Sequence, residues 1–211
     1  CQHVPLCLDA SQSVGHLPTP AVNASLCFSA HKGLLGPSGL GGLYLPPQQN
    51  PTPLVFGGTG SASASDAQPD ALPDRYESGT PNLPGLAGLN AALGFLAATG
   101  LDQVEAREAA LCDALLRGLS DLPGVVAHGP QVGVRRAPVV SISVPAWDLG
   151  ELALALDRRG VCVRAGLHCA AAAHRVLGTL DAGGTLRFSP GFLNTDADIQ
   201  DTLKVMEELL T

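Results

Sequence analysis

Charged side chains are scarce in this chain of 211 residues, since Asp, Glu, Lys and Arg together make up only 15% of it. The formal net charge is −7 and no cluster of basic residues is present. This composition disfavours nucleic-acid binding. No apolar run is long enough to span a membrane and no stretch resembles a signal peptide, so we expect no membrane partner. Because 45% of the residues are hydrophobic, the chain has the composition of a globular protein.

The cysteines lack the spacings of a metal or redox motif. The chain has six of them, with no C-x-x-C pair. In a chain of this size such cysteines are expected to be reduced and mostly buried, which predicts a cytoplasmic protein. Cys169 is the exception, because Arg164 and His168 precede it closely.

Short apolar runs and helical periodicity predict a mixed α/β fold. We expect strands over 4–8, 24–29, 41–45, 138–144, 161–164 and 184–189, and helices over 83–99, 101–119, 149–159 and 196–210. The segment 57–73, rich in Gly, Ser and Ala, predicts a loop. The C-terminal part has the pattern of a compact small domain, whereas the N-terminal part has that of half a domain. We therefore predict domains at 1–110 and 111–211.

Two motifs near the N-terminus point to a pyridoxal phosphate (PLP) site. Asp9 ends an apolar run in L-D-A-S-Q-S-V-G-H, and Lys32 lies in F-S-A-H-K-G-L-L-G-P-S-G-L-G-G. A carboxylate there is costly unless it is paired, and a protonated pyridine nitrogen would pair with it. The amine of Lys32 would supply the Schiff base. The alternatives are an Asp that caps the following turn and a surface lysine in a Gly-rich loop.

Further polar residues near these motifs are candidates for the same site. Gln12 would donate to the ring hydroxyl, or is a solvated turn residue. Ser29 and His31 are candidates for binding the phosphate oxygens. Thr80, in R-Y-E-S-G-T-P-N, either presents its amide and hydroxyl to a phosphate or caps the helix that follows.

A second cluster, V-R-A-G-L-H-C-A at 163–170, contains a candidate nucleophile. Arg164 and His168 would favour the thiolate of Cys169; the alternative is a buried structural cysteine. His168 and His174 are also candidate metal ligands together with Cys169, but the nearby sequence offers no fourth ligand. An arginine amid apolar neighbours, as Arg187 is, usually pairs with a carboxylate of protein or substrate. A thiol beside a PLP site suggests carbon–sulfur bond chemistry.

These motifs together resemble a known family. The two N-terminal motifs, R-Y-E-S-G-T-P-N-L-P-G, V-R-A-G-L-H-C-A and F-L-N-T-D-A-D-I are similar to the signatures of the cysteine desulfurases, which belong to the class V aminotransferase group of fold type I PLP enzymes. The resemblance covers the whole chain. Because members of that family are longer, it implies the C-terminal half of such an enzyme: part of the large domain of the PLP-dependent transferase fold type I, followed by the small C-terminal α/β domain.

The resemblance also implies roles for the candidate residues. The enzyme would convert L-cysteine to L-alanine and pass the sulfur, as a persulfide, to an acceptor protein for iron–sulfur cluster assembly. Thr80 would reach the phosphate of the partner subunit, which implies a homodimer. The alternatives are a selenocysteine lyase, another class V reaction, or an inactive fragment that acts only as a binding module. The implied sites are catalytic Lys32 and Cys169, cofactor-binding Asp9, Gln12, Ser29, His31, Lys32 and Thr80, substrate-binding Arg187 and Arg164, and no metal ligands.

Overall fold

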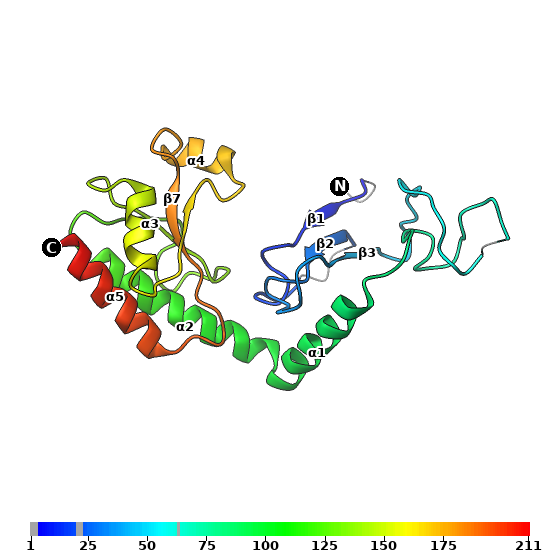
Figure 1. The fold of residues 1–211 in the computed structure, drawn as a ribbon, viewed down its shortest axis with the longest axis horizontal. Coiled ribbons are helices and arrows are strands. Elements are labelled where there is room, and N and C mark those ends of the chain that lie inside the picture. The colour runs from blue at the N-terminus through cyan, green and yellow to red at the C-terminus, as the bar shows by residue number, and fades with distance from the viewer. Residues whose placement is uncertain (1–3, 20–22, 63) are drawn as a thin grey trace. The chain divides into compact units, whose positions relative to one another are not determined.

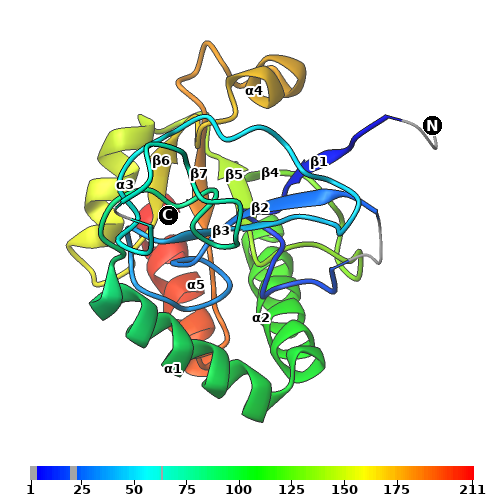
Figure 2. The same ribbon diagram turned by 90° about the vertical axis from the view of Figure 1, so that its right-hand side faces the viewer.

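The computed structural model of the chain describes residues 4–19, 23–62 and 64–211. The chain forms two compact units, Cys1–Thr99 and Gly100–Thr211 (Figures 1 and 2). The domain boundary that the sequence predicts, between 110 and 111, falls inside the long helix α2 (Leu101–Ser120) rather than between the units. The helix stays whole because its buried face packs within the second unit.

The first unit contains a small mixed sheet. Its strands are β1 (Cys7–Asp9), β2 (Ser25–Ser29) and β3 (Gly41–Tyr44), in the spatial order β1-β2-β3. β1 and β2 are parallel, and β2 and β3 are antiparallel. The parallel pairing brings the carboxyl ends of β1 and β2 to the same edge of the sheet. The sequence predicts that the first strand is buried, but β1 is an edge strand of this sheet and is largely exposed.

Helix α1 (Leu83–Thr99) confirms the prediction over 83–99. Asn82 Oδ1 accepts a hydrogen bond of 3.1 Å from the Gly85 amide at its start. A glycine lets this helix approach the loop after β2, because a Cβ on Gly88 would lie only 2.6 Å from Cγ of Pro37. Only Gly85 and Leu96 of this helix are buried. The helix is apolar on several sides and packs on one, so much of its apolar surface remains exposed.

The second unit packs helices against an antiparallel sheet. Its strands have the order β4-β5-β7-β6, and α2 and α5 run side by side along it (Figures 1 and 2). In chain order after α2, its elements are β4 (Val126–His128), β5 (Val140–Ser143), α3 (Leu149–Asp157), β6 (Arg164–Gly166), α4 (Ala171–Leu177), β7 (Thr185–Phe188) and α5 (Asp196–Leu210).

Apolar side chains from these helices and strands form one core, whose fully buried members include Leu111, Leu115, Leu119, Ile142, Leu152, Leu156, Leu186 and Met206. Side chains cap two helices. Asp148 accepts bonds from the first amides of α3, and Thr195 and Asp198 form a reciprocal capping box at α5. This core fixes the sheet that carries the second group of candidate residues.

Three local predictions in this unit differ from the structure. The strand expected over 161–164 forms at Arg164–Gly166 instead, because it pairs there with β7. β4 and α4 were not predicted, since they are only 3 and 7 residues long and carry weak periodicity.

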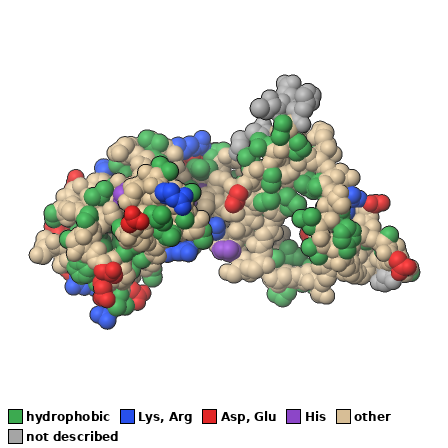
Figure 3. Space-filling view, turned by 90° about the horizontal axis from the view of Figure 1, so that it is seen from above, with side chains coloured by type: hydrophobic (Ala, Val, Ile, Leu, Met, Phe, Trp, Pro, Cys, Tyr) green, Lys and Arg blue, Asp and Glu red, His purple; other side chains and the backbone are tan. Residues whose placement is uncertain are grey.

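Three properties of the described residues concern the membrane, nucleic-acid and metal partners considered above. Within the described residues, no single helix is long and apolar enough to cross a membrane; only α1 and α2 taken together pass that test, by length and composition, with a break between them. On the face in Figure 3, Lys and Arg side chains are scattered among acidic and apolar ones. In the same part of the chain, no cluster of three or more His, Cys, Asp or Glu side chains has the arrangement of a metal site.

Candidate active site

Asp9 and Lys32 lie close to one another at the carboxyl edge of the first sheet. Asp9 is exposed at the end of β1, and its Oδ1 accepts a hydrogen bond of 2.9 Å from the Ser11 amide. Hydrogen bonds from Ser11, together with the nearby positive charge of Lys32, hold the pKa of Asp9 below its ordinary value. The carboxylate therefore caps the turn, as the alternative reading of the sequence expects, and also remains an anion beside an amine.

Two glycines join the Asp9 motif to the Lys32 motif. Residues 10–17 form a compact turn, closed by its own backbone hydrogen bonds, and Gly15 within it packs against Gly33 after β2. A Cβ on Gly33 would lie 2.4 Å from the carbonyl oxygen of Val14, and one on Gly15 would lie 2.3 Å from the Gly33 carbonyl carbon. Such distances exclude any side chain at either position. Lys32 is therefore held next to a backbone contact that fixes where its side chain starts.

The other predicted cofactor residues follow these strands or precede α1. Ser29 is the last residue of β2 and is half-buried, whereas Gln12 and His31 are exposed in the two turns. Thr80 is exposed on the segment before α1. The observed cap of that helix is the side chain of Asn82, so the capping alternative for Thr80 is wrong.

The second unit holds the other candidates. Arg164 on β6 and Arg187 on β7 are register partners in the antiparallel pair. The Nε atom of Arg187 is buried and has no hydrogen-bond partner among the described residues. Burial and the charge of Arg164 lower the pKa of Arg187, and the nearby Cys169 opposes that effect. The ion pairs formed by the described residues include neither arginine, so this pair can receive an anionic group.

Cys169 is exposed on a tight turn over 167–170, so the alternative of a buried structural cysteine is wrong. The Ala170 amide donates a 2.8 Å hydrogen bond to the Leu167 carbonyl and closes this turn. Nε2 of His168 lies 3.0 Å from the Thr185 carbonyl oxygen on β7. Burial lowers the pKa of His168, and the charges of Arg187, His174 and Arg164 add to this, while the Thr185 bond opposes it. The sulfur is thus accessible beside Arg187. His168 does not supply the positive charge that the sequence predicts, because its lowered pKa favours the neutral ring.

Sequence reasoning missed three residues that shape these sites. Ser11 supplies hydrogen bonds to Asp9, Thr185 holds His168, and Thr179 bonds His174. Thr179 and Thr185 follow short glycine-containing segments that resemble ordinary turns. No sequence signal distinguishes them, because their importance comes from hydrogen bonds that form in space, around the end of α4 and the start of β7.

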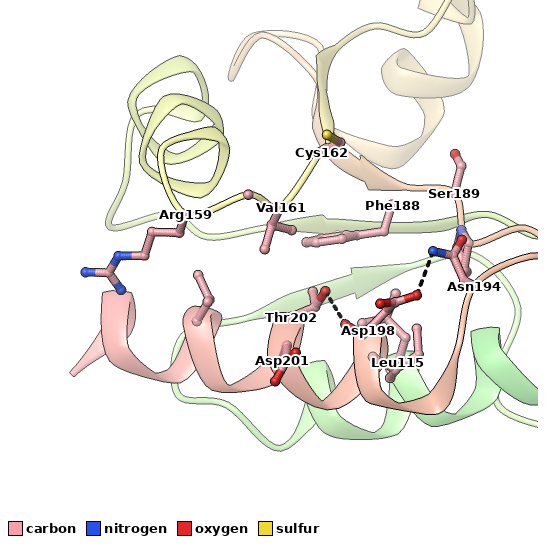
Figure 4. A pocket seen from close by; sticks show the side chains of 14 residues that line it. Leu115, Arg159, Val161, Cys162, Phe188, Ser189, Asn194, Asp198, Asp201 and Thr202 are labelled. Carbon is pink, nitrogen blue, oxygen red and sulfur yellow. Dashed lines mark hydrogen bonds between the residues drawn. The ribbon is translucent and has the colours of Figure 1, made fainter.

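A cavity of 480 Å³ lies elsewhere in the second unit, between α5 and the segment 159–162 (Figure 4). Phe188 points across it, Cys162 lies at one wall, and Asp198 is bonded to Asn194 at another. None of the predicted site residues lines this cavity.

Comparison with known proteins places these observations in a family context. The family model described as Aminotransferase class-V matches residues 2–202. The chain is 34% identical to a probable cysteine desulfurase of Pyrococcus abyssi over 96% of its own length, and 31% identical to one of Methanothermobacter thermautotrophicus. It covers 51% and 52% of those two proteins, so it spans about half the length of these relatives.

Solved structures give the same result for the fold. The apo structure of a cysteine desulfurase from Thermococcus onnurineus superposes with a TM-score of 0.81 at 32% identity, covering 98% of this chain and 52% of that one. The S-sulfonic acid form of the cysteine desulfurase CsdA from Escherichia coli gives a TM-score of 0.78 at 25% identity, covering 99% of this chain and 53% of that one.

Proposed function

Because the chain belongs to the class V aminotransferase family, we propose that it forms part of a PLP-dependent cysteine desulfurase. The reaction converts L-cysteine to L-alanine and leaves the sulfur on Cys169. The observation that carries this proposal is the exposed thiol of Cys169 near Arg187. In the first unit, the amine of Lys32 also lies near the ionised carboxylate of Asp9.

The donor set of the first unit fits PLP. The cofactor needs an amine, an anion for its ring nitrogen, and polar groups for its phosphate. Lys32 supplies the amine, and Asp9 stays ionised because its pKa is lowered by Ser11 and Lys32. Gln12 would contact the ring oxygen, and Ser29 and His31 the phosphate. When bound, PLP supplies an aldehyde for a Schiff base and a ring that accepts electrons from the substrate α-carbon.

Residues of both units would then have separate roles in the reaction. Asp9 would pair with the pyridine nitrogen of the bound cofactor, and the Lys32 amine would take the α-proton of the substrate and return one to it. Arg187, with Arg164 beside it, binds the substrate carboxylate.

Cys169 would accept the sulfur. Its thiolate sulfur forms a bond to the substrate sulfur while the carbon–sulfur bond of the substrate breaks. The carbon keeps the electron pair and takes up a proton, so that alanine leaves and a persulfide remains on Cys169. An acceptor protein then takes the terminal sulfur atom for iron–sulfur cluster assembly.

The oligomer and location are part of the same proposal. Thr80 is exposed on the segment before α1 and would reach the phosphate bound in a second subunit, which makes the enzyme a homodimer. Its cysteines are free among the described residues, which is compatible with a reducing, cytoplasmic environment.

The test is the Cys169→Ser variant of the full-length protein. We expect it to lose persulfide formation and sulfur transfer while the visible absorbance of the Schiff base at Lys32 remains. The matched control is Cys162→Ser, which removes the other exposed thiol of the second unit. Undiminished sulfur transfer in Cys169→Ser would refute the role of Cys169. A keto acid product, or activity with selenocysteine alone, would favour another class V reaction, and no PLP absorbance at all would indicate a binding module.

A further inference from the structure

The turn that carries Cys169 has an unfavourable backbone. His168 and Cys169 have φ values of 51° and 61°, in the left-handed region that residues with side chains avoid. Two such residues in succession persist only where the surrounding structure holds them in place. Because Cys169 is exposed, its own side chain supplies little of this restraint. The hydrogen bond from the Ala170 amide to the Leu167 carbonyl closes the turn, and the side chain of His168 holds it to β7.

The ring of His168 is held from two sides. Its Nε2 atom lies 3.0 Å from the Thr185 carbonyl oxygen, and since a carbonyl only accepts, this nitrogen carries the proton. Its ring also lies against that of His174, with the centroids 5.8 Å apart and the planes tilted by 51°. The orientation of His168 therefore depends on the orientation of His174.

His174 is itself anchored. It is buried, with 4% of its surface exposed, and its Nδ1 atom lies 2.7 Å from Oγ1 of Thr179. The Thr179 amide donates to the His174 carbonyl, and the Gly184 amide donates to the Thr179 carbonyl, both at 2.9 Å. Thr179 thus connects the end of α4 to the start of β7, the strand that also holds His168.

Hydrogen bonds fix which way each of the two rings faces. Nε2 of His168 donates to the Thr185 carbonyl oxygen, and Nδ1 of His174 is paired with Oγ1 of Thr179. Two arginines lie near this pair, since burial lowers the pKa of His168 and the charges of Arg187 and Arg164 add to that effect.

We propose that His174 is a positioning residue for Cys169, which acts through His168 and is oriented by its hydrogen bond to Thr179. This inference rests on the proposed sulfur-accepting role of Cys169 for its meaning in the reaction. The contacts that carry it belong to one unit and involve neither PLP nor L-cysteine.

The experiment measures thiol alkylation in the full-length protein. Iodoacetamide labels Cys169 and Cys162, and mass spectrometry gives the ratio of their rates; Cys162 is an exposed internal reference in the same unit. We expect Thr179→Val to change this ratio by about threefold or more, because the hydrogen bond is lost at nearly constant side-chain volume. Thr179→Ser, which keeps the hydroxyl, restores the wild-type ratio.

His174→Leu, which removes the ring and the bond together, should change the ratio at least as much as Thr179→Val. Val176→Ala is the matched control on the same helix, since Val176 is 88% exposed and its loss leaves the ratio unchanged. An unchanged ratio in Thr179→Val overturns the proposal, and so does a change that Thr179→Ser fails to restore. If His174→Leu does not fold, the Thr179 pair decides the question alone.

The two proposals fail separately. Wild-type protein that forms no persulfide refutes the desulfurase function and leaves the alkylation ratios as they are. Wild-type protein that is active, with ratios unaffected by the Thr179 variants, refutes the positioning role alone.

Discussion

Arg164 and Arg187 face one another as register partners on β6 and β7, and the ion pairs of the described residues include neither of them. Like charges opposite one another on neighbouring strands are destabilising. The buried Nε of Arg187 also lacks a partner in the described part of the chain. An anion between the two guanidinium groups would relieve both costs, and a substrate carboxylate has the geometry for it.

If Arg187 binds the substrate carboxylate as proposed, replacing it should weaken substrate binding. Arg187→Gln should raise the KM for L-cysteine by about 10- to 100-fold, because a charge-assisted hydrogen bond to the carboxylate is lost. Arg187→Lys should recover only part of the lost affinity for L-cysteine, because an ammonium group cannot form two parallel hydrogen bonds to a carboxylate. Arg175→Gln, an exposed site on α4, is the control. Steady-state kinetics with unchanged KM in Arg187→Gln would assign the arginine another role.

The charge of Asp9 should govern the chemical step. Asp9→Asn keeps the size of the side chain but removes the anion that would hold the pyridine nitrogen protonated. We expect kcat for alanine formation to fall at least about tenfold while the visible absorbance of bound PLP persists. Asp66→Asn, in the exposed loop before α1, is the matched control. Equal kcat values in Asp9→Asn and wild type would remove Asp9 from the mechanism.

The contact between Gly33 and Val14 should be intolerant of a methyl group. In Gly33→Ala the new Cβ would lie 2.4 Å from a backbone oxygen, so the two motifs must separate. We expect the free energy of unfolding to fall by about 1–3 kcal/mol, measured by urea denaturation, with weaker PLP absorbance at Lys32. Gly58→Ala is the control, because a Cβ there meets nothing within 4 Å. A stability equal to that of the control would mean that the loop adapts freely.

Sequence reasoning predicted the long helices and the central strands well. Helices α1 and α5 begin and end where the periodicity and capping signals place them, at Leu83–Thr99 and Asp196–Leu210. Local signals suffice there, because each helix carries its own caps and apolar spacing. The short elements β4 and α4 were missed, since their formation depends on pairing and packing with distant segments.

The candidate site was predicted in part for the same reason. Asp9 and Lys32 were paired from their motifs, and the structure brings them close enough for Lys32 to affect the pKa of Asp9. The supports of Cys169 were not predicted. His174 was considered only as a metal ligand, whereas it is buried and bonded to Thr179. Such a contact depends on the turn between α4 and β7, which no periodic pattern encodes.

The histidines of the second unit should make its stability fall in mild acid. Burial lowers the pKa of His128 and of His168, and the nearby charges of Arg187 and Arg164 add to the effect at His168. The unfolded chain, with histidine pKa values of about 6.5, then binds more protons than the folded chain below that pH. Stability from this source is fully present above about pH 6.5, decreases as the pH falls through it, and levels off below the folded pKa values.

We therefore expect the Tm of the full-length protein to be lower at about pH 5.5 than at about pH 7.5. The carboxylates whose pKa values are depressed, Asp9, Glu105 and Asp198, lose their contribution only in stronger acid, so this comparison separates the histidines from them. The double variant His128→Gln, His168→Gln should show a smaller decrease in Tm over the same interval, because neither glutamine takes up a proton. An equal decrease in wild type and double variant would show that groups other than these two histidines control the acid sensitivity.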